Sequence, residues 1–559
     1  MKNKETKTEK YGYGIEGDAK NIQMVILMSR SSLGISPLDY TQPSCLLSIK
    51  QKPALFNIIT KMVKRGLKEI IFVVNSLNKP VMEIFMEKNY PKIHVTYVIQ
   101  KKFKNTVNSL QLCAKYITKP FLLLNGNVIC DVNFDFYESW AAVTNCDGEY
   151  FDKLYVKSNS DGYLTYINKE KEFLDGEFEY TVGMYFFGNF SLLKSCLFRS
   201  NFVAVENLDL STVLKYYLSK IAMKKYDIEF CYNTNTVMEL ISSVRKNMSG
   251  RSFNNFNINE YGVITKTSTE SKILSEINWY EEICKTPLAQ LCPHFLGQKG
   301  EGDSLSYQLE YMDYTSLAEY FVYYPMQEYQ WKYIFNTLIQ YAKILWYYKK
   351  APEDFDMIKN TTKMYIDKTN DRVAKWERQD LLNLDMVIIN NKPMHGFKYC
   401  WEHLQPKLKD LILESKKYAG IIHGDLCFGN ILYTPRSSIF KFIDPRGNFG
   451  EDSIYGDIRY DVAKLRHSYH GLFDYITSDL FIVNRIDNNK FDYKFLSNSM
   501  PNPNIMDTIL LNNGFDVDQI ELLEGILFIS MIPLHNDAKD RQIMYFLTAL
   551  QCFNNQLNN

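Results

Sequence analysis

Several features that mark membrane, secreted or metal-bound proteins are missing from this chain of 559 residues. No apolar run approaches the roughly 18 to 20 residues that a membrane-spanning helix needs. The first residues carry mixed charges and lack the apolar core of a signal peptide. The 11 cysteines form no CxxC pair and no cluster at metal-ligand spacing, so neither a zinc site nor a disulfide framework is indicated. These absences predict a cytoplasmic protein with reduced thiols.

Net charge is also missing from the sequence. Lys and Arg together number 64, and Asp and Glu together also number 64. A formally neutral chain offers no overall electrostatic attraction to nucleic acid or to an anionic membrane. We therefore expect neither nucleic-acid binding nor membrane insertion. The sequence does not indicate an oligomeric state.

The length and the pattern of the sequence predict more than one domain, because one hydrophobic core rarely grows to this size. Residues 1–20 are polar without an apolar period, and we expect a disordered tail. Over residues 21–245, short apolar runs such as "IQMVILM", "EIIFVVN" and "PFLLLNGNVI" alternate with helix-like segments such as "PALFNIITKMVKRGL". This alternation predicts βαβ units around a largely parallel, doubly wound sheet.

A different pattern begins near residue 246. The segment "SGRSFNNFNINEYGVITKTS" alternates like two strands around a turn, and "ESKILSEINWYEEICK" has apolar residues at helical spacing. From about residue 320 the pattern is chiefly helical, and residues 480–559 indicate helix and loop with no assigned role. We expect strands and a helix over residues 246–320 and a chiefly helical region over residues 321–559.

The most informative chemistry lies in "HGDLCFGNILY" at residues 423–433 and "IFKFIDPRG" at residues 439–447. Transfer of the γ-phosphoryl group of ATP needs a group that orients the acceptor hydroxyl and a Mg²⁺ ion held against the phosphates. Asp425 could orient the hydroxyl, and Asn430 and Asp444 could give oxygen ligands to the metal. The turn "YTPRSS" would let two strands pair and bring Asn430 and Asp444 side by side.

These two segments resemble the catalytic loop and the metal-binding segment of the aminoglycoside phosphotransferase and choline kinase family. The spacing from Asp to Asn by five and from Asn to Asp by fourteen matches that family. The resemblance implies a protein-kinase-like, two-lobed α+β domain that uses ATP and Mg²⁺. It makes Asp425 the catalytic base and Asn430 and Asp444 the magnesium ligands. His423 would hold the loop in place.

The same resemblance implies further residues upstream. A lysine on a strand should contact the ATP phosphates and pair with a glutamate on the following helix. "GVITKTS" offers Lys266, and "ILSEINWYEEI" offers Glu276, with Glu281 and Glu282 as competitors. The backbone from Glu310 to Met312, in "YQLEYMDY", would meet the adenine.

The glycine-rich loop of the kinases is poorly represented. "SGRSFNNFN" contains Gly250 but no GxGxxG pattern. A single glycine is weak evidence for a phosphate-binding loop.

Residues 22–245 resemble the sugar nucleotidyltransferases, which make activated sugars or alcohols on a doubly wound sheet. The resemblance rests on "VILMSRSSLGISPLDYTQPSCLLSIKQKPALFNII", "LLLNGNVICD" and "EYTVGMYFFG". Alignment on Pro37 and Leu38 nevertheless indicates that the residues expected to handle the nucleotide phosphates and the metal are replaced. The replacements are Arg30 and Ser32 at glycine positions, Gly34 for the arginine, Ser44 for the lysine, and Asn127 and Asn233 for the acids.

Two interpretations of this first domain stay open. It is a catalytically inactive scaffold or substrate-binding module, or a rearranged site keeps some transfer activity. Asp131 would then be a metal ligand, although an aspartate at the end of a strand is more often a cap. An amide can coordinate a metal but carries no charge, so the loss of both acids should weaken phosphate handling.

We predict a phosphotransferase that uses ATP and Mg²⁺ to phosphorylate a hydroxyl of a small metabolite, such as a sugar, sugar acid or amino alcohol of surface-glycan assembly. The alternatives are a bifunctional kinase and nucleotidyltransferase, and a non-catalytic scaffold. Arg446 lies two places after Asp444, where its guanidinium would repel choline and bind a carboxylate or phosphate. Alternatively, Arg446 turns away and pairs with Asp457 or Asp461.

Overall fold

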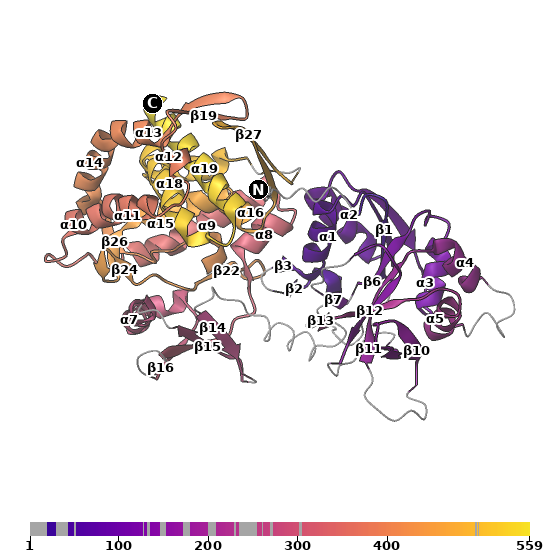
Figure 1. Ribbon diagram of the computed structural model, residues 1–559. Helices are drawn as coiled ribbons and strands as arrows, with labels where there is room; N and C mark the ends of the chain where they lie inside the picture. The colour runs from indigo at the N-terminus through magenta and orange to yellow at the C-terminus, as the bar shows by residue number, and fades with distance from the viewer. Residues whose placement is uncertain are drawn as a thin grey trace, which may run out of the picture. The chain divides into compact units, whose positions relative to one another are not determined.

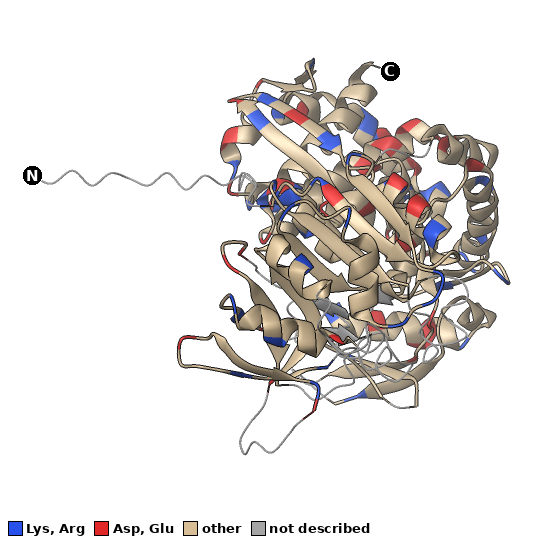
Figure 2. Ribbon diagram, turned by 90° about the vertical axis from the view of Figure 1, so that its right-hand side faces the viewer, with Lys and Arg blue, Asp and Glu red and all other residues tan. Residues whose placement is uncertain are grey.

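The protein is described here by a computed structural model. The chain separates into two compact units, Met1–Asn247 and Met248–Asn559. Basic and acidic residues are interspersed along the described helices (Figure 2). No described helix has both the length and the apolar character needed to cross a membrane. The structure describes residues 19–29, 43–49, 52–126, 128–130, 135–145, 153–170, 179–198, 208–228, 231–233, 254–259, 261–268, 272–300, 305–497, 500 and 502–558.

The first unit is built around a nine-stranded mixed sheet. The central strand β1 is the apolar run QMVILM, and all six of its residues are buried. It pairs in parallel with β4 and with β6, and β4 pairs in parallel with β5. The nine strands are β1 Gln23–Met28, β4 Glu69–Val74, β5 His94–Ile99, β6 Phe121–Asn125, β8 Trp140–Thr144, β9 Tyr155–Ser158, β10 Leu164–Asn168, β11 Glu179–Phe187 and β12 Lys224–Asp227.

Helices cover both faces of this sheet, as predicted for a doubly wound domain (Figure 1). Val25 and Leu27 of β1 share one buried cluster with residues of α3, α4 and α5. Each of these three helices begins at an Asn or Asp whose side chain accepts a backbone N–H, which satisfies an otherwise unpaired donor. The helices are α1 Ala54–Lys64, α2 Asn78–Asn89, α3 Thr106–Cys113, α4 Phe190–Leu197 and α5 Leu210–Leu218.

The expected parallel pairing is found in the β6-β1-β4-β5 half of the sheet and between β8 and β12. The long strand β11 runs antiparallel to β6, β8 and β9, and β9 is antiparallel to β10. A buried apolar run reads the same in either direction, so the sequence could not show this reversal. Short elements complete the unit: η3 Ser44–Leu46, β2 Ser48–Ile49, β3 Lys52–Pro53, β7 Val128–Cys130 and β13 Cys231–Asn233.

The second unit begins with a four-stranded antiparallel sheet of order β14-β15-β17-β16. Helix α7 follows β15 in the chain and lies beside this sheet in Figure 1. This arrangement agrees with the expected strand, turn, strand and helix. The elements are β14 Asn254–Ile258, β15 Val263–Ser268, α7 Lys272–Cys284, η5 Pro287–Leu291, β16 Phe295–Lys299 and β17 Ser306–Glu310.

The rest of the second unit is chiefly helical. On α9, Ile334, Leu338, Ala342 and Leu345 are buried on one face, as their helical spacing predicts. Helix α18 is buried from Ile520 to Met531 and contacts both α15 and α19. The helices are α8 Leu317–Tyr323, α9 Glu328–Trp346, α10 Met357–Thr362, the π-helix η7 Lys363–Asp367, α11 Lys368–Ala374, α12 Gln379–Leu382, α13 Phe397–His403, α14 Gln405–Glu414, η8 Ser415–Tyr418, η9 Phe428–Asn430, α15 Ile458–Tyr469, α16 Phe473–Thr477, α17 Asn504–Asn512, α18 Val517–Met531, η10 Ile532–His535 and α19 Lys539–Asn558.

Short strands are inserted among these helices, and only the pair β22 and β23 was predicted from the sequence. The strands β27 and β28 form a hairpin within residues 480–559, where helix and loop were expected. Most of the β27 side chains are exposed, so the hairpin lacks the alternating buried face that identifies a strand in a sequence. The strands are β18 Thr315–Ser316, β19 Met386–Ile389, β20 Lys392–His395, β21 Ala419–Ile421, β22 Ile431–Thr434, β23 Ile439–Phe442, β24 Asn448–Phe449, β25 Glu451–Asp452, β26 Tyr455–Asp457, β27 Phe481–Asp487 and β28 Lys490–Phe495.

Candidate functional site

The loop of residues 423–430, which we call the catalytic loop, is held by hydrogen bonds to α15 and by a hydrogen bond within the loop. The carboxylate of Asp461, on α15, accepts the backbone N–H groups of His423 and Gly424, each at 2.8 Å. Burial raises the pKa of Asp461 to about 6, against the effect of these hydrogen bonds. Within the loop, Asn430 Nδ2 donates to the backbone oxygen of Asp425 at 2.8 Å. The loop therefore has a fixed backbone in front of α15.

His423 is a structural residue of this loop, as expected. It is fully buried, and its Nδ1 accepts the backbone N–H of Asp425 at 3.3 Å. Its ring packs edge-on against Trp279 and Phe442. Burial lowers the pKa of His423 to about 4, so the imidazole is neutral at physiological pH.

The hairpin of β22 and β23 brings the next two candidate residues to one end. Ile431 pairs with Phe442, and the N–H of Ile443 donates to the oxygen of Asn430 at 3.0 Å. Asn430 and Asp444 thus leave the same end of the hairpin. Asp444 has a φ of 58°, in the left-handed region, and its N–H donates to the Tyr280 hydroxyl at 3.3 Å. That contact fixes the turn at Asp444 against α7.

Lys266, on β15, meets a glutamate of α7 and the aspartate of the hairpin. Its Nζ lies 2.6 Å from Glu276 Oε2 and is also hydrogen-bonded to Asp444 Oδ1. Tyr307 OH donates to the same Glu276 oxygen at 3.1 Å. Burial lowers the pKa of Lys266, but Asp444 and Glu276 more than offset this, so the pKa is raised and the amine stays charged. Glu276 itself is buried, and that burial raises its pKa.

The two competing glutamates do not take this place. Glu282 is exposed and pairs with Lys285 at 2.8 Å. Glu281 is half-buried, and neither residue is among the described ion-pair partners of Lys266. Glu276 is the α7 glutamate that contacts Lys266.

Asp425 has a cationic partner that the sequence did not reveal. Lys464 Nζ, from α15, lies 2.9 Å from Asp425 Oδ1. Burial would raise the pKa of Asp425, but Lys464 and then Lys272 outweigh it and hold the pKa well below its usual range. The carboxylate is therefore ionised at every physiological pH. It can accept a hydrogen bond from an incoming hydroxyl, but it is a weak base.

The donor set of Asn430 and Asp444 fits a magnesium ion. Asn430 donates its amide Nδ2 within the loop, so Oδ1 is the side-chain atom that could ligate a metal. The side chain of Asp444 is 39% exposed, and Oδ1 is its oxygen bonded to Lys266. Amide and carboxylate oxygens are the ligands that Mg²⁺ prefers, and the ion normally keeps water and substrate oxygens as well.

The segment expected to meet adenine follows the last strand of the small sheet. Glu310 ends β17, with its N–H bonded to the oxygen of His294 at 2.9 Å and its side chain exposed. Tyr311 N–H bonds to Gly262 at 2.8 Å. Met312 is half-buried, and its backbone N–H and C=O have no hydrogen-bond partner in the described part of the chain. Unpaired backbone groups of this kind can bind a purine edge.

Arg446 does not form either of the expected ion pairs. Its Nη1 donates to the hydroxyl of Tyr460 at 3.3 Å. Asp457 is engaged by Arg459 at 2.7 Å, and Asp461 binds the amides of the catalytic loop. The expectation that Arg446 pairs with Asp457 or Asp461 is thus not met among the described contacts.

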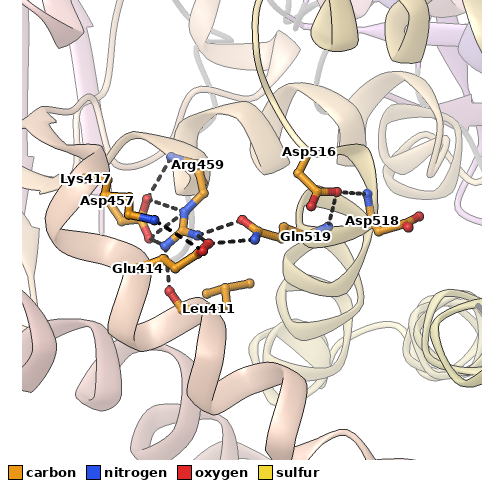
Figure 3. Close-up of polar contacts among 8 residues, drawn as sticks. All are labelled: Leu411, Glu414, Lys417, Asp457, Arg459, Asp516, Asp518 and Gln519. Carbon is orange, nitrogen blue, oxygen red and sulfur yellow. Dashed lines mark hydrogen bonds and ion pairs between the residues drawn. The ribbon is translucent and has the colours of Figure 1, made fainter.

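Helix α15, which carries Tyr460, Asp461 and Lys464, is anchored by Arg459 (Figure 3). The Arg459 guanidinium donates to Asp457 Oδ2 at 2.7 Å, to the oxygen of Leu411 at 2.8 Å and to Gln519 Oε1 at 2.8 Å. These partners lie at the start of α15, on α14 and on α18. A buried guanidinium with carboxylate and carbonyl partners is a strong, directional anchor. It sets the position of the helix that faces Asp425.

The first unit has a different set of polar residues at the carboxyl ends of its parallel strands. Ser29 follows β1 and is hydrogen-bonded through Oγ to Gln100 Oε1, after β5. Gln100 Nε2 donates to Asn108 Oδ1 at 3.0 Å. Asn125 ends β6, and its Nδ2 is buried without a hydrogen-bond partner among the described residues. Ligands of doubly wound sheets bind at this edge.

Most residues on which the sequence comparison of this unit rested lie outside the described residues. This holds for Arg30, Ser32, Gly34, Pro37, Leu38, Asn127 and Asp131, and also for Gly250 of the second unit. Ser44 lies in η3 and is half-buried, and Asn233 ends β13.

Sequence reasoning missed the residues of α15 and α11 that surround the catalytic loop. All twelve residues of α15 are buried, so no apolar stripe separates a core face from a site face. The spacing of Tyr460 and Lys464, four residues apart, was the available signal, because residues at that spacing lie on the same side of a helix. Lys368 comes from α11, far from the motifs in sequence, and no local signal pointed to it.

Sequence comparisons match the first unit. Residues 25–150 match the family model described as nucleotidyl transferase. Over 126 residues the chain is 29% identical to the bifunctional protein GlmU of Methanococcus maripaludis, which covers 22% of this chain and 29% of that protein. Over 116 residues it is 28% identical to the mannose-1-phosphate guanyltransferase of Gibberella zeae, covering 20% and 32%. The chain thus spans less than a third of the length of either relative.

Solved structures are similar to about two fifths of the chain. The UDP-glucose pyrophosphorylase of Acinetobacter baumannii has 11% identity and a TM-score of 0.34, covering 40% of this chain and 92% of that one. The CTP:phosphocholine cytidylyltransferase of Streptococcus pneumoniae has 17% identity and a TM-score of 0.33, covering 40% and 97%. The sequence matches support a nucleotidyltransferase domain at residues 25–150, in agreement with the resemblance of the sequence.

Proposed function

We propose that residues 248–559 transfer the γ-phosphoryl group of ATP to a hydroxyl of a small metabolite, such as a sugar, sugar acid or amino alcohol, with the help of Mg²⁺. One observation carries this proposal. Lys266 contacts both Glu276 and Asp444, although Lys266 and Asp444 lie 178 residues apart in the sequence. Asp444 and Asn430 leave the same end of one hairpin, directly after the loop that carries Asp425.

Each side chain has a task in this reaction. Lys266, kept charged by its two carboxylate partners, would bind the ATP phosphates. Asn430 and Asp444 would hold Mg²⁺, which when bound neutralises charge on the phosphates. Met312 would offer its unpaired backbone groups to the adenine. Asp425 would accept a hydrogen bond from the acceptor hydroxyl and so direct its oxygen at the γ-phosphorus.

The bonds and charges of this step balance with ATP and the alcohol alone. The acceptor oxygen forms a bond to the γ-phosphorus as the bond between that phosphorus and the β,γ-bridging oxygen breaks. ADP takes the electron pair of the broken bond, and the hydroxyl proton passes by way of Asp425 to water. A weakly basic Asp425 suits a loose transition state, in which the proton leaves late and orientation matters more than basicity.

The test is ADP formation by the full chain with Mg²⁺ and a panel of sugars, sugar acids and amino alcohols. We expect acceptor-dependent ADP formation that stops when EDTA is added and that Asp425→Asn abolishes. ADP formation that Asp425→Asn leaves unchanged, or that no acceptor stimulates, would remove the proposal. In that case the second unit would be a binding module or scaffold.

A second candidate function is nucleotidyl transfer by the first unit, which would make the chain bifunctional. The match of residues 25–150 to the nucleotidyl transferase family favours it. The two activities are chemically consecutive, because a kinase makes the phosphate ester that a nucleotidyltransferase then activates. Such a pair would suit the assembly of surface glycans.

This second activity is tested by pyrophosphate release. The full chain is incubated with CTP, UTP, GTP or dTTP and a set of sugar or alcohol phosphates. Acceptor-dependent pyrophosphate would establish the bifunctional enzyme. Its absence with every pair would support the inactive-domain interpretation, which rests on the replacement of the acidic positions by Asn127 and Asn233.

A further inference from the structure

Two basic side chains meet at the hydroxyl of Tyr460, next to the catalytic loop, and a third lies one turn farther along α15. Arg446 Nη1 donates to Tyr460 OH at 3.3 Å, and Lys368 Nζ donates to the same oxygen at 3.4 Å. Lys464 lies one helical turn beyond Tyr460 on α15, with its Nζ 2.9 Å from Asp425 Oδ1. We call Lys368, Arg446 and Lys464 the cation cluster. Through Lys464, the cluster contacts Asp425, the aspartate expected to orient the acceptor.

The charge of this cluster is only partly neutralised by the protein. Lys464 is paired with Asp425. In the described parts of the chain, no carboxylate oxygen lies within 4.0 Å of Lys368 Nζ or of the Arg446 guanidinium. Arg446 Nε is also buried without a hydrogen-bond partner there. A buried donor without a partner carries a desolvation cost, which a bound acceptor group would remove.

The electrostatics of Lys368 reflect the same excess of positive charge. Burial, and then the neighbouring cations Arg446, Arg372 and Lys464, hold the pKa of Lys368 well below its usual range. Asp425 acts in the opposite direction but does not compensate. An anion placed among these side chains would favour the protonated, charged form of Lys368, because it would offset the repulsion from the neighbouring cations.

The backbone fixes both ends of the cluster. Gly424 has a φ of 77°, and a Cβ there would lie 2.7 Å from Arg446 Cβ, so Arg446 passes directly against the catalytic loop. Arg446 N–H also donates to the oxygen of His423 at 2.8 Å. On the other side, the π-helix Lys363–Asp367 ends immediately before Lys368. Single π-helical turns are frequent at functional sites, where they redirect a side chain.

We infer that the phosphate acceptor carries an anionic group, a carboxylate or a phosphate, which Lys368 and Arg446 bind while Asp425 meets its hydroxyl. This inference rests on the proposed phosphotransferase function and adds the class of acceptor. The planar guanidinium of Arg446 suits two oxygens of one oxyanion, and Lys368 supplies a point charge. A quaternary ammonium alcohol would be repelled from the same place.

Direct binding of small anions tests the inference without any turnover. Inorganic phosphate and glycerate are titrated into the nucleotide-free full chain by calorimetry, with glycerol as the neutral counterpart. We expect Lys368→Ala and Arg446→Ala each to weaken the binding of the preferred anion by about tenfold or more, because each removes a charge-assisted hydrogen bond. Lys375→Ala, which removes an exposed lysine after the end of the same helix, is the matched control and should bind like the wild type.

The outcomes distinguish a carboxylate from a phosphate on the acceptor, and the cation cluster from Lys266 as the site that binds the anion. Tighter binding of glycerate indicates a carboxylate acceptor, and tighter binding of phosphate indicates a phosphorylated one. Lys266→Met should keep this binding if the cation cluster is the site. Failure of the wild type to bind either anion, or equal binding by the wild type, Lys368→Ala and Arg446→Ala, would overturn the inference.

Kinetics with any acceptor that the chain phosphorylates give an independent check. Lys368→Ala should raise the KM for the acceptor by about tenfold while leaving the KM for ATP unchanged, and Lys368→Arg should restore most of the affinity. A rise in the KM for ATP instead would show that the cluster binds the γ-phosphate, and would overturn the inference. If no acceptor is phosphorylated but the anions bind as described, the proposed function fails and the anion site remains.

Discussion

The two units place opposite kinds of chemistry where a ligand would bind. At the sheet edge of the first unit the side chains joined by hydrogen bonds, Ser29, Gln100 and Asn108, are uncharged. In the second unit, Lys266 and Asp444 are ion-paired, and Asp425 is paired with Lys464. The handling of phosphates needs fixed charge, because amide dipoles alone neutralise little of a triphosphate.

The two proposed activities are supported by different kinds of observation. The family match favours nucleotidyl transfer in the first unit, whereas the alignment of the sequence predicts that the charged residues for this reaction are replaced. The geometry favours phosphoryl transfer in the second unit, where three charged contacts connect the small sheet, the hairpin and α15.

The largest effect is expected from the two aspartates of the second unit. Asp425→Asn should lower kcat by about a hundredfold or more, because it removes the group that orients the hydroxyl. It should leave ATP binding nearly intact. Asp444→Asn should instead weaken Mg²⁺-dependent nucleotide binding by about tenfold or more, because it removes a metal ligand. Single-turnover kinetics and nucleotide titration with and without Mg²⁺ measure the two effects.

The decisive result is that Asp425→Asn should lower kcat, whereas Asp444→Asn should weaken nucleotide binding. If Asp425→Asn kept more than about a tenth of the wild-type kcat, the assignment of Asp425 would be wrong. Loss of nucleotide binding in both variants to the same extent would mean that the loop collapses as a whole. Asp410→Asn, on the exposed side of α14, is the control for the removal of a carboxylate.

The next effect concerns the stability of the catalytic loop. Asp461→Asn should destabilise the second unit by about 2 kcal/mol. Three N–H groups now donate to the two carboxylate oxygens of Asp461, and an amide would offer them only one oxygen. Trp346 donates to the same carboxylate, so the substitution also disturbs that hydrogen bond. Denaturant titration of wild type, Asp461→Asn and the Asp410→Asn control measures it. Equal stability of all three would contradict the anchoring role of Asp461.

The comparison of the two units is sharpened by restoring charge to the first one. Asn127→Asp should raise pyrophosphate release by about tenfold over the wild type, because it returns a carboxylate to the position of a metal ligand. The assay is run in the Asp425→Asn background, so that the second unit consumes no nucleotide. An unchanged rate, or no pyrophosphate from either protein, would show that the missing acid is not what limits the first unit.

The sequence predicted the parts of the site that are joined by local spacing. Asp425, Asn430 and Asp444 fall within one loop and one hairpin, and Lys266 and Glu276 fall on a strand and the next helix. The residues that surround them come from elsewhere. Lys464 and Asp461 lie on a helix buried on every side, which erases the periodicity that would reveal a face.

A similar limit applies to the fold. The buried runs of β1 and β4 and their alternation with helices predicted the parallel half of the first sheet. The antiparallel strand β11 was not distinguished, because direction leaves no mark in a fully buried run. The β27–β28 hairpin was missed for the opposite reason, since its mostly exposed side chains give no apolar alternation. The direction of β11 and the formation of the β27–β28 hairpin both depend on tertiary packing, which a single sequence does not show.

The smallest effect is a change in the pH dependence of the second unit. Asp425 has a pKa well below its usual range, because Lys464 and Lys272 outweigh its burial. The carboxylate is ionised throughout the range from pH 5 to 8, so we expect no acid limb from Asp425 in the wild-type kcat profile. Lys464→Met removes the largest of these lowering influences, so we expect burial to raise the pKa of Asp425 in that variant.

In the Lys464→Met variant the protonated form of Asp425 should begin to accumulate as the pH falls toward 5. Since only the carboxylate can accept the hydrogen bond of the hydroxyl, kcat at pH 5 should fall below kcat at pH 7 by about twofold or more. In the wild type, ionisation of Asp425 should cause no fall in kcat between pH 7 and pH 5. The measurement is kcat at saturating acceptor from pH 5 to 8 for both proteins, with the shape of the profile as the readout. Parallel profiles would mean that Lys464 orients Asp425 without setting its charge.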